Sequence, residues 1–131
     1  MSGANLKADM RARRRLSLSE YRHGRLDVET RAIRAAIGQW LQEHRRRALS
    51  PADVEEGRAL LGAFDRAWRA GLANRKAFGA DLRLARSKAR LTQAEVGSLV
   101  GRHANTVAQW ERGEQLPEPL VQEAVLARLS R

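Results

Sequence analysis

Apolar residues recur along this chain at the spacing of amphipathic α-helices, in which every third or fourth residue faces the same side. Between residues 27 and 44 one such stripe is formed by Ile33, Ile37, Trp40 and Leu41. After residue 50 a second stripe is formed by Val54, Leu61, Phe64, Trp68 and Leu72. Ser50, Pro51 and Asp53 give the second helix a strong start, with a serine N-cap, a proline at the first helical position and an acid at the third. The pattern predicts an all-α chain.

The two stripes predict an antiparallel helical hairpin over residues 23–74, because only about five residues connect them. Two helices make a thin core, and so small a domain is marginal alone. The hairpin is therefore expected to pack on the C-terminal domain, on a second copy of itself, or on another protein through residues 20–74. The candidate face comprises Trp40, Val54, Leu61, Phe64, Trp68 and Leu72. The two tryptophans suit interface anchors, and they equally suit intramolecular core positions.

A second pattern, over residues 92–113, predicts two short helices joined by a sharp turn. Thr92 and Glu95 have the spacing of a capping box at a helix start. Gly101 follows an apolar face where a helix needs a left-handed residue to end. Val107 and Trp110 then give a second helix, beginning near residue 104, its inward face. Two helices of this length around a turn that contains glycine are typical of a helix-turn-helix.

The segments TQAEVGSLVG and NTVAQWERGEQLP resemble the DNA-binding domain of Cro/CI-type (XRE, lambda-repressor-like) regulators. The resemblance covers residues ~79–131, within an expected domain over residues 75–131. It implies a first helix over residues 80–90 and a structural ion pair between Arg86 and Glu111 of the Trp-Glu-Arg-Gly motif. Gly97 departs from the alanine usual in the family, and the usual fifth helix is either missing or replaced from elsewhere. The expected fold is thus a C-terminal lambda-repressor-like bundle, preceded by the hairpin and a basic disordered tail.

In such a motif the second helix lies in the major groove while the first crosses the DNA backbone. The resemblance implies that Ala104, Asn105 and Gln109 face bases, and asparagine and glutamine can pair bidentately with adenine. The complete set of candidate base contacts is Arg102, His103, Ala104, Asn105 and Gln109. The candidate backbone contacts are Thr92, Gln93, Thr106 and Arg112. Two alternatives stay open, since Asn105 can serve as a helix cap and His103 can simply close the turn.

The net charge of +10 favours an anionic partner, with double-stranded DNA the first candidate. Residues 1–50 carry 12 Lys and Arg side chains against 5 Asp and Glu, so most of the charge precedes the helix-turn-helix. Residues 1–22 have little apolar periodicity and are expected to form a flexible arm. The arm either contacts the DNA backbone or solubilises the chain. The run Arg45–Arg47 either complements the dipole of the preceding helix or contacts DNA.

Several function classes are disfavoured by the sequence. The three histidines, His23, His44 and His103, lie far apart without the spacing of a metal site, and no phosphate loop or nucleophile motif occurs. We therefore expect no catalytic site, no metal and no cofactor. Absence of cysteine, of an 18-residue apolar run and of a secretory h-region predicts a cytoplasmic protein of bacterial or phage type, associated with the nucleoid and not with a membrane.

The sequence thus predicts a sequence-specific transcriptional regulator, a homodimeric repressor that binds an inverted repeat through residues 104–112. Two half-sites are expected because a single motif has too small a footprint for useful specificity. A hypothesis of another class is an antitoxin-like adaptor, whose N-terminal helices bind a partner protein while the helix-turn-helix autoregulates the operon. A third is a nucleic-acid coating protein, whose binding would depend on salt and not on sequence.

Overall fold

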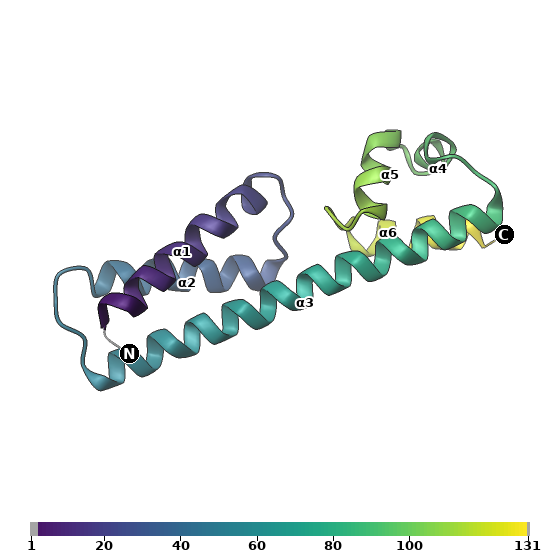
Figure 1. Cartoon of the computed structure of the whole chain (residues 1–131). Helices are drawn as coiled ribbons and strands as arrows, with labels where there is room; N and C mark the ends of the chain where they lie inside the picture. Colours follow the sequence, from purple (N-terminus) through teal and green to yellow (C-terminus); the bar gives the residue numbers. More distant parts are fainter. Residues whose placement is uncertain (1–2, 131) are drawn as a thin grey trace. The chain divides into compact units, whose positions relative to one another are not determined.

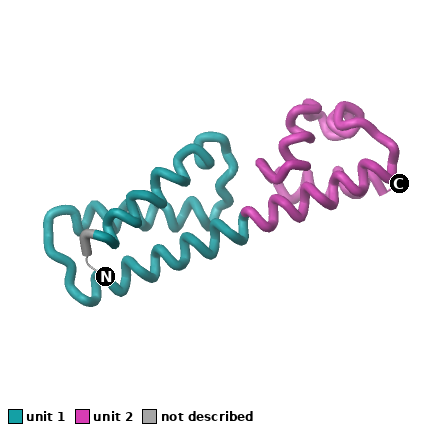
Figure 2. Tube along the Cα trace, viewed as in Figure 1, with its two compact units in different colours: residues 1–71 teal, residues 72–131 magenta. Residues whose placement is uncertain are grey.

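The chain is described from a computed structural model, in which residues 3–130 form six α-helices and no strand (Figure 1). The predicted all-α class is confirmed for these residues. The chain divides into two compact units, residues 1–71 and 72–131 (Figure 2). Each unit has its own apolar core, so the two are described separately. The division falls three residues before the expected domain boundary.

Unit 1 is a three-helix arrangement of α1 (Gly3–Arg22), α2 (Val28–Glu43) and the first part of α3 (Pro51–Ala89) (Figure 1). Its fully buried core takes residues from all three helices: Leu6, Met10, Ile37, Trp40 and Phe64. Partly buried apolar residues surround that core: Ile33, Leu41, Leu49, Val54, Leu60, Leu61 and Trp68. The two predicted stripes thus face one another, and α1 completes the core.

Helix α1 lies where the sequence predicted a flexible arm, and this expectation is corrected. Leu6 and Met10, four residues apart, are both 0% exposed, and Ser17 is buried further along the helix. Lys7 Nζ also donates to the His44 carbonyl at 2.6 Å. Two apolar residues among many charges do not predict a helix by themselves. Burying them against α2 and α3 supplies the free energy that offsets the loss of chain entropy.

Capping hydrogen bonds define the start of α2 and confirm the predicted start of α3. Asp27 Oδ1 accepts from Thr30 N at 2.8 Å. Ser50 Oγ accepts from Asp53 N at 3.1 Å, and Asp53 Oδ2 accepts from Ser50 N at 2.9 Å. Each bond satisfies a backbone donor at a helix end that has no partner within the helix.

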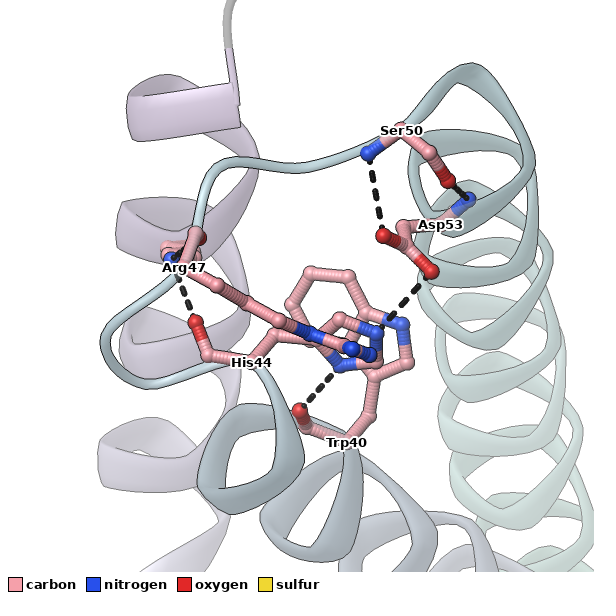
Figure 3. Close-up of polar contacts among 6 residues, drawn as sticks. Trp40, His44, Arg47, Ser50 and Asp53 are labelled. Atoms are coloured by element: carbon pink, nitrogen blue, oxygen red, sulfur yellow. Dashed lines mark hydrogen bonds and ion pairs between the residues drawn. The ribbon is translucent and has the colours of Figure 1, made fainter.

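The connection between α2 and α3 is closed around a buried histidine (Figure 3). His44 stacks on Trp40 with ring centroids 4.4 Å apart and bonds the Trp40 carbonyl through Nδ1 at 2.7 Å. Its Nε2 lies 3.1 Å from Asp53 Oδ1 (Figure 3). His44 therefore links the end of α2 to the start of α3, which is a structural role.

Helix α3 is continuous from Pro51 to Ala89 and runs through the expected domain boundary between residues 74 and 75. Gly71 and Gly79 are both buried within the helix. A glycine inside a helix costs only about 1 kcal/mol relative to alanine, so the flanking residues carry the helix through. The first helix of the C-terminal domain is thus the last part of α3.

Unit 2 contains the end of α3 with α4 (Gln93–Val100), α5 (Ala104–Glu111) and α6 (Pro119–Leu129). Its buried core consists of Phe78, Leu82, Val96, Val107, Trp110, Val125 and Leu129. The partly buried residues Ala85, Ala89 and Leu91 pack against it. In the described part of the chain, no helix is long and apolar enough to cross a bilayer.

Candidate nucleic-acid interface

The start of α4 is a complete capping box. Thr92 Oγ1 accepts from Glu95 N at 3.1 Å, and Glu95 Oε1 accepts from Thr92 N at 3.0 Å. These reciprocal bonds fix where the helix begins. Val96 points inward and is fully buried, while Thr92 is exposed beside the α4 N-terminus. The backbone amides there are available to an anion on the side that the cap leaves open.

The turn between α4 and α5 depends on two glycines, one for its backbone conformation and one for the space that a side chain would fill. Gly101 has φ +68°, a left-handed conformation that ends α4. At Gly97 a Cβ atom would lie 2.3 Å from the Arg102 carbonyl oxygen, which is closer than any real contact. Gly97 therefore lets the turn fold directly against α4.

The C-terminal half of α5 is anchored to α3. Phe78 and Trp110 pack edge to face with centroids 6.4 Å apart. A Cβ on Gly79 would lie 2.4 Å from the Trp110 carbonyl, so the two backbones touch there. Arg75, buried, donates from Nε to the Gly113 carbonyl at 3.1 Å. These three contacts set the position of α5 on the domain.

Arg86, Glu111 and Gln93 join α3, α5 and α4 in one polar cluster. Arg86 Nε donates to Glu111 Oε2 at 2.7 Å, and its Nη2 donates to Oε1 at 3.0 Å. Glu111 is only 5% exposed, so an unpaired carboxylate there would be costly. The same hydrogen bonding raises the pKa of the Arg86 guanidinium. The structure thus brings together the two residues that the resemblance paired.

Gln93 was expected to contact DNA phosphate, but in the structure its amide donates to Glu111 Oε1 at 3.3 Å. This bond orients the Gln93 side chain at the first turn of α4. An oriented amide can still offer its second N–H to a phosphate oxygen, since an amide nitrogen carries two donors.

The N-terminal half of α5 faces solvent. His103 and Asn105 are exposed, and Ala104 and Thr106 are partly exposed. His103 occupies the N-cap position without a capping side-chain bond, and the first turn of α5 contains no acid. The positive end of the helix dipole is therefore not neutralised locally. This end of α5 is therefore suited to bind an anionic partner that also forms hydrogen bonds.

The remaining candidate contacts lie around this helix end. Gln109 is half-buried one turn further along α5. Arg102 is exposed in the turn and lies 3.8 Å from Glu118. Arg112 makes two 3.1 Å hydrogen bonds to Glu114, which raise the pKa of its guanidinium. A phosphate would have to compete with Glu114 for Arg112. Arg112 is therefore a weaker candidate for a DNA contact than Arg102.

The geometry of unit 2 agrees with the comparison with known families. Residues 77–131 match the family described as "Helix-turn-helix domain". The C-terminal unit contains a helix-turn-helix domain. Domains of this class are typical of DNA-binding regulators, in which the second helix of the motif reads the major groove. No curated protein and no solved structure matches the chain.

Sequence reasoning missed two residues that position the recognition helix, Arg75 and Gly79. A glycine inside a helical pattern can have a packing reason, but Gly79 was assigned none from the sequence. Arg75 carried no signal, because its contact is with a carbonyl oxygen 38 residues away in sequence.

The candidate partner face of unit 1 is largely covered within the chain. Trp40 and Phe64 are each only 1% exposed and share a core with Leu6 and Met10 of α1. Val54, Leu61 and Trp68 pack partly buried against that core, and Leu72 is half-buried at the start of unit 2. Among the described residues no group of three or more His, Asp or Glu side chains is placed to hold a metal ion.

Proposed function

We propose that the protein is a sequence-specific transcriptional regulator of the Cro/CI (XRE) type, which binds DNA through α5 in the major groove. One observation carries the proposal: α5 is anchored to α3 at its C-terminal end, while its N-terminal end presents exposed polar residues and an unneutralised helix dipole. A recognition helix needs this combination of a fixed axis and a free, hydrogen-bonding tip.

Within this proposal, Asn105 and Gln109 read bases through bidentate amide pairing, and the Ala104 methyl meets an apolar base edge. His103 and Arg102 lie at the turn and add a base or phosphate contact. The motif is positioned on the DNA backbone by Thr92, Gln93 and Thr106. Arg112 contacts the DNA backbone only when its hydrogen bonds to Glu114 are broken. Backbone contacts fix the register, whereas base contacts supply the specificity.

The proposed regulator acts as a homodimeric repressor on an inverted repeat. Support comes from the small size of the motif, because a single recognition helix contacts too few bases for useful specificity in a genome. A two-fold dimer places its recognition helices about one helical turn apart on the same face of the duplex. Repression then follows because the bound dimer occupies the promoter. Expression of a reporter gene whose promoter contains the operator would measure it.

The adaptor hypothesis receives less support. It required an apolar face on unit 1 that stays uncovered until another protein arrives. Two large residues of that face, Trp40 and Phe64, are buried in a core that they share with residues of α1 of the same chain. We therefore retain the regulator as the proposed function.

The test is a selection of bound sites from random duplex DNA, using the intact protein and the variant Asn105→Ala/Gln109→Ala. The control variant Gln39→Ala/Asn74→Ala removes the same side-chain types from exposed positions on α2 and α3. We expect an inverted repeat from the wild type and the control, and a lost or relaxed motif from the α5 variant. Each lost base contact should cost about 1–3 kcal/mol. Recovery of no motif by the wild type would contradict the proposal.

A further inference from the structure

The arginine run of α1 is divided between two faces of the helix. Arg13 points to α3, where its Nε donates to Asp65 Oδ1 at 2.9 Å and its Nη2 to Oδ2 at 3.3 Å. Arg11, Arg14 and Arg15 have no ion pair or side-chain hydrogen bond among the described residues and are exposed. Their spacing of three and four places them on one side of α1. One arginine of the run is therefore structural, and three are available.

The three available arginines border a groove between α1 and α2. Arg11 and Arg14 line it from α1, and Arg34 and Arg45 line it from α2 and the residues just after it. The groove has a volume of about 690 Å³, and an adjoining hollow of about 270 Å³ adds Arg15. No acidic side chain lines either space. Five arginines thus line the groove and its adjoining hollow, together called the basic groove, and no carboxylate is among the lining residues.

The groove is built to hold these groups in place. At Gly38, on α2, a Cβ would lie 3.3 Å from the central guanidinium carbon of Arg14, so the missing side chain makes room for that group. Arg34 Nε donates to the buried Ser17 Oγ at 2.9 Å, and its guanidinium lies 5.6 Å from the Tyr21 ring centroid. Partly preordered cations lose less entropy when they bind an anion.

The same arrangement is unfavourable in the absence of an anion. Arg11 and Arg15 are four residues apart on α1, and like charges at this spacing destabilise a helix. Some other arginines of the chain meet carboxylates, as Arg13 meets Asp65 and Arg86 meets Glu111. The charge of the basic groove is therefore not explained by the packing of unit 1, and an anionic ligand would relieve it.

We propose that the basic groove of unit 1 binds the phosphodiester backbone of nucleic acid without reading its sequence. Guanidinium groups suit phosphate because their planar fork bonds two oxygens at once. Protein interfaces have an apolar centre, whereas Leu41 is the one large apolar side chain among the residues that line the main groove. The proposal rests on the proposed function in taking DNA as the polyanion. Because both units belong to one chain, binding by one raises the effective concentration of the other at the DNA.

The experiment compares two variants that each remove three positive charges. Arg11→Gln/Arg14→Gln/Arg45→Gln removes three of the five arginines of the basic groove, and Arg22→Gln/Arg31→Gln/Arg58→Gln is the matched control at exposed positions outside it. Affinity for a random-sequence duplex is measured with the full chain over a series of salt concentrations. Each phosphate contact contributes about 0.9 to the slope of log affinity against log salt. We expect the groove variant to lower that slope by about 2.7 and the control to lower it by less than about 1.

Equal slopes for the groove and control variants would overturn the proposal, because the effect would then reflect net charge alone. Circular dichroism should show unchanged helix content in both variants, since none of the replaced side chains has a bonding partner among the described residues. A competition arm uses poly-glutamate at a matched concentration of charge. Displacement of the duplex by poly-glutamate as effective as displacement by unlabelled duplex would overturn the assignment to phosphate.

Site selection separates this proposal from the proposed function. The groove variant should recover the same motif as the wild type, with weaker binding to all sequences. The variant Asn105→Ala/Gln109→Ala should lose the motif while keeping the wild-type salt slope to within about 1. If the wild type recovers no motif but the groove variant still lowers the slope, the regulator fails and the groove stands.

Discussion

At the scale of the residue, Gly79 sets the distance between two helices. The carbonyl oxygens of Trp110 and Glu111 would lie 2.4 and 2.7 Å from a Cβ at this position. Both are backbone atoms, so no side-chain rotation can relieve the clash. The absence of one methyl group therefore fixes where the recognition helix sits on α3.

Gly79→Ala is expected to destabilise the protein by about 2 kcal/mol, as overpacking a close contact usually does. It should also weaken DNA binding, because α5 has to move away from α3. The control is Gly62→Ala on the same helix, where a Cβ would meet only the flexible end of Arg66 at 3.3 Å. That change should stabilise the protein by up to about 1 kcal/mol through helix propensity. Urea unfolding of both variants measures the difference, and equal effects would refute the argument.

The carboxyl group of Asp53 makes the free energy of unfolding depend on pH. The backbone hydrogen bond from Ser50 lowers the pKa of Asp53 below its ordinary value of 3.8, and the hydrogen bond to His44 lowers it further. A depressed pKa in the folded state means that the stabilisation is present above the unfolded pKa. It is lost as the pH falls through the folded pKa.

Asp53→Asn is therefore expected to lower the free energy of unfolding at neutral pH. The difference from the wild type should shrink as the pH falls well below 3.8. Glu55→Gln, an exposed acid two residues on in the same helix, is the control. Denaturant unfolding at both pH values measures the effect. A gap between wild type and Asp53→Asn that persists in acid would show that the carboxylate charge is not its source.

At the scale of the element, α5 is a short helix with an imperfect start. His103 is its N-cap and makes no capping bond, and α6 likewise begins at Glu118 without one. Aspartate is among the best N-cap residues, since its carboxylate accepts from free backbone amides and complements the dipole. The N-cap of α5 is therefore poor for stability, and it leaves the backbone amides of this helix end without a side-chain partner from His103.

His103→Asp is expected to change stability and DNA binding in opposite directions. The free protein should gain about 1 kcal/mol from the new cap. DNA affinity should fall by about tenfold or more, because a carboxylate would face the phosphates and lose a contact worth about 1–3 kcal/mol. The control Glu118→Asp adds a cap to α6 without changing net charge. Thermal unfolding measures the expected gain in stability, and DNA titration measures the expected loss of affinity. If His103→Asp bound DNA as tightly as the wild type, DNA would not contact this end of α5.

At the scale of the whole molecule, the two units share helix α3 but have no buried core residue in common. Phe64 lies in the core of unit 1, at 1% exposed, and Leu82 lies in the core of unit 2, at 0% exposed. Cooperative opening follows such cores, because each is a separate set of packed side chains.

Phe64→Ala is expected to cost about 3–5 kcal/mol and Leu82→Ala about 2–5 kcal/mol. Amide hydrogen exchange should accelerate in α1 and α2 for the first variant, and in α4 and α5 for the second. Protection in the other unit should change little in each case. If either change accelerated exchange equally across the chain, the two cores would be one cooperative unit.

The sequence alone determined the helical class, the helix starts at Ser50 and Thr92, and the helix-turn-helix with its glycine turn. These features are local: a cap acts over three residues and an apolar stripe over four. A side chain and the backbone amide that it caps are close in any conformation that begins the helix. Such features can therefore be recognised without knowing the rest of the fold.

The tertiary structure decided what depends on residues distant in sequence. Leu6 and Met10 become buried, and α1 becomes a helix, only because Trp40 and Phe64 offer them a surface. The close approach at Gly79 likewise depends on where α5 returns to α3, as does the basic groove on where α1 meets α2. Burial energy and charge crowding arise from groups brought together in space. The pattern of residues along the chain does not show which distant groups will come into contact.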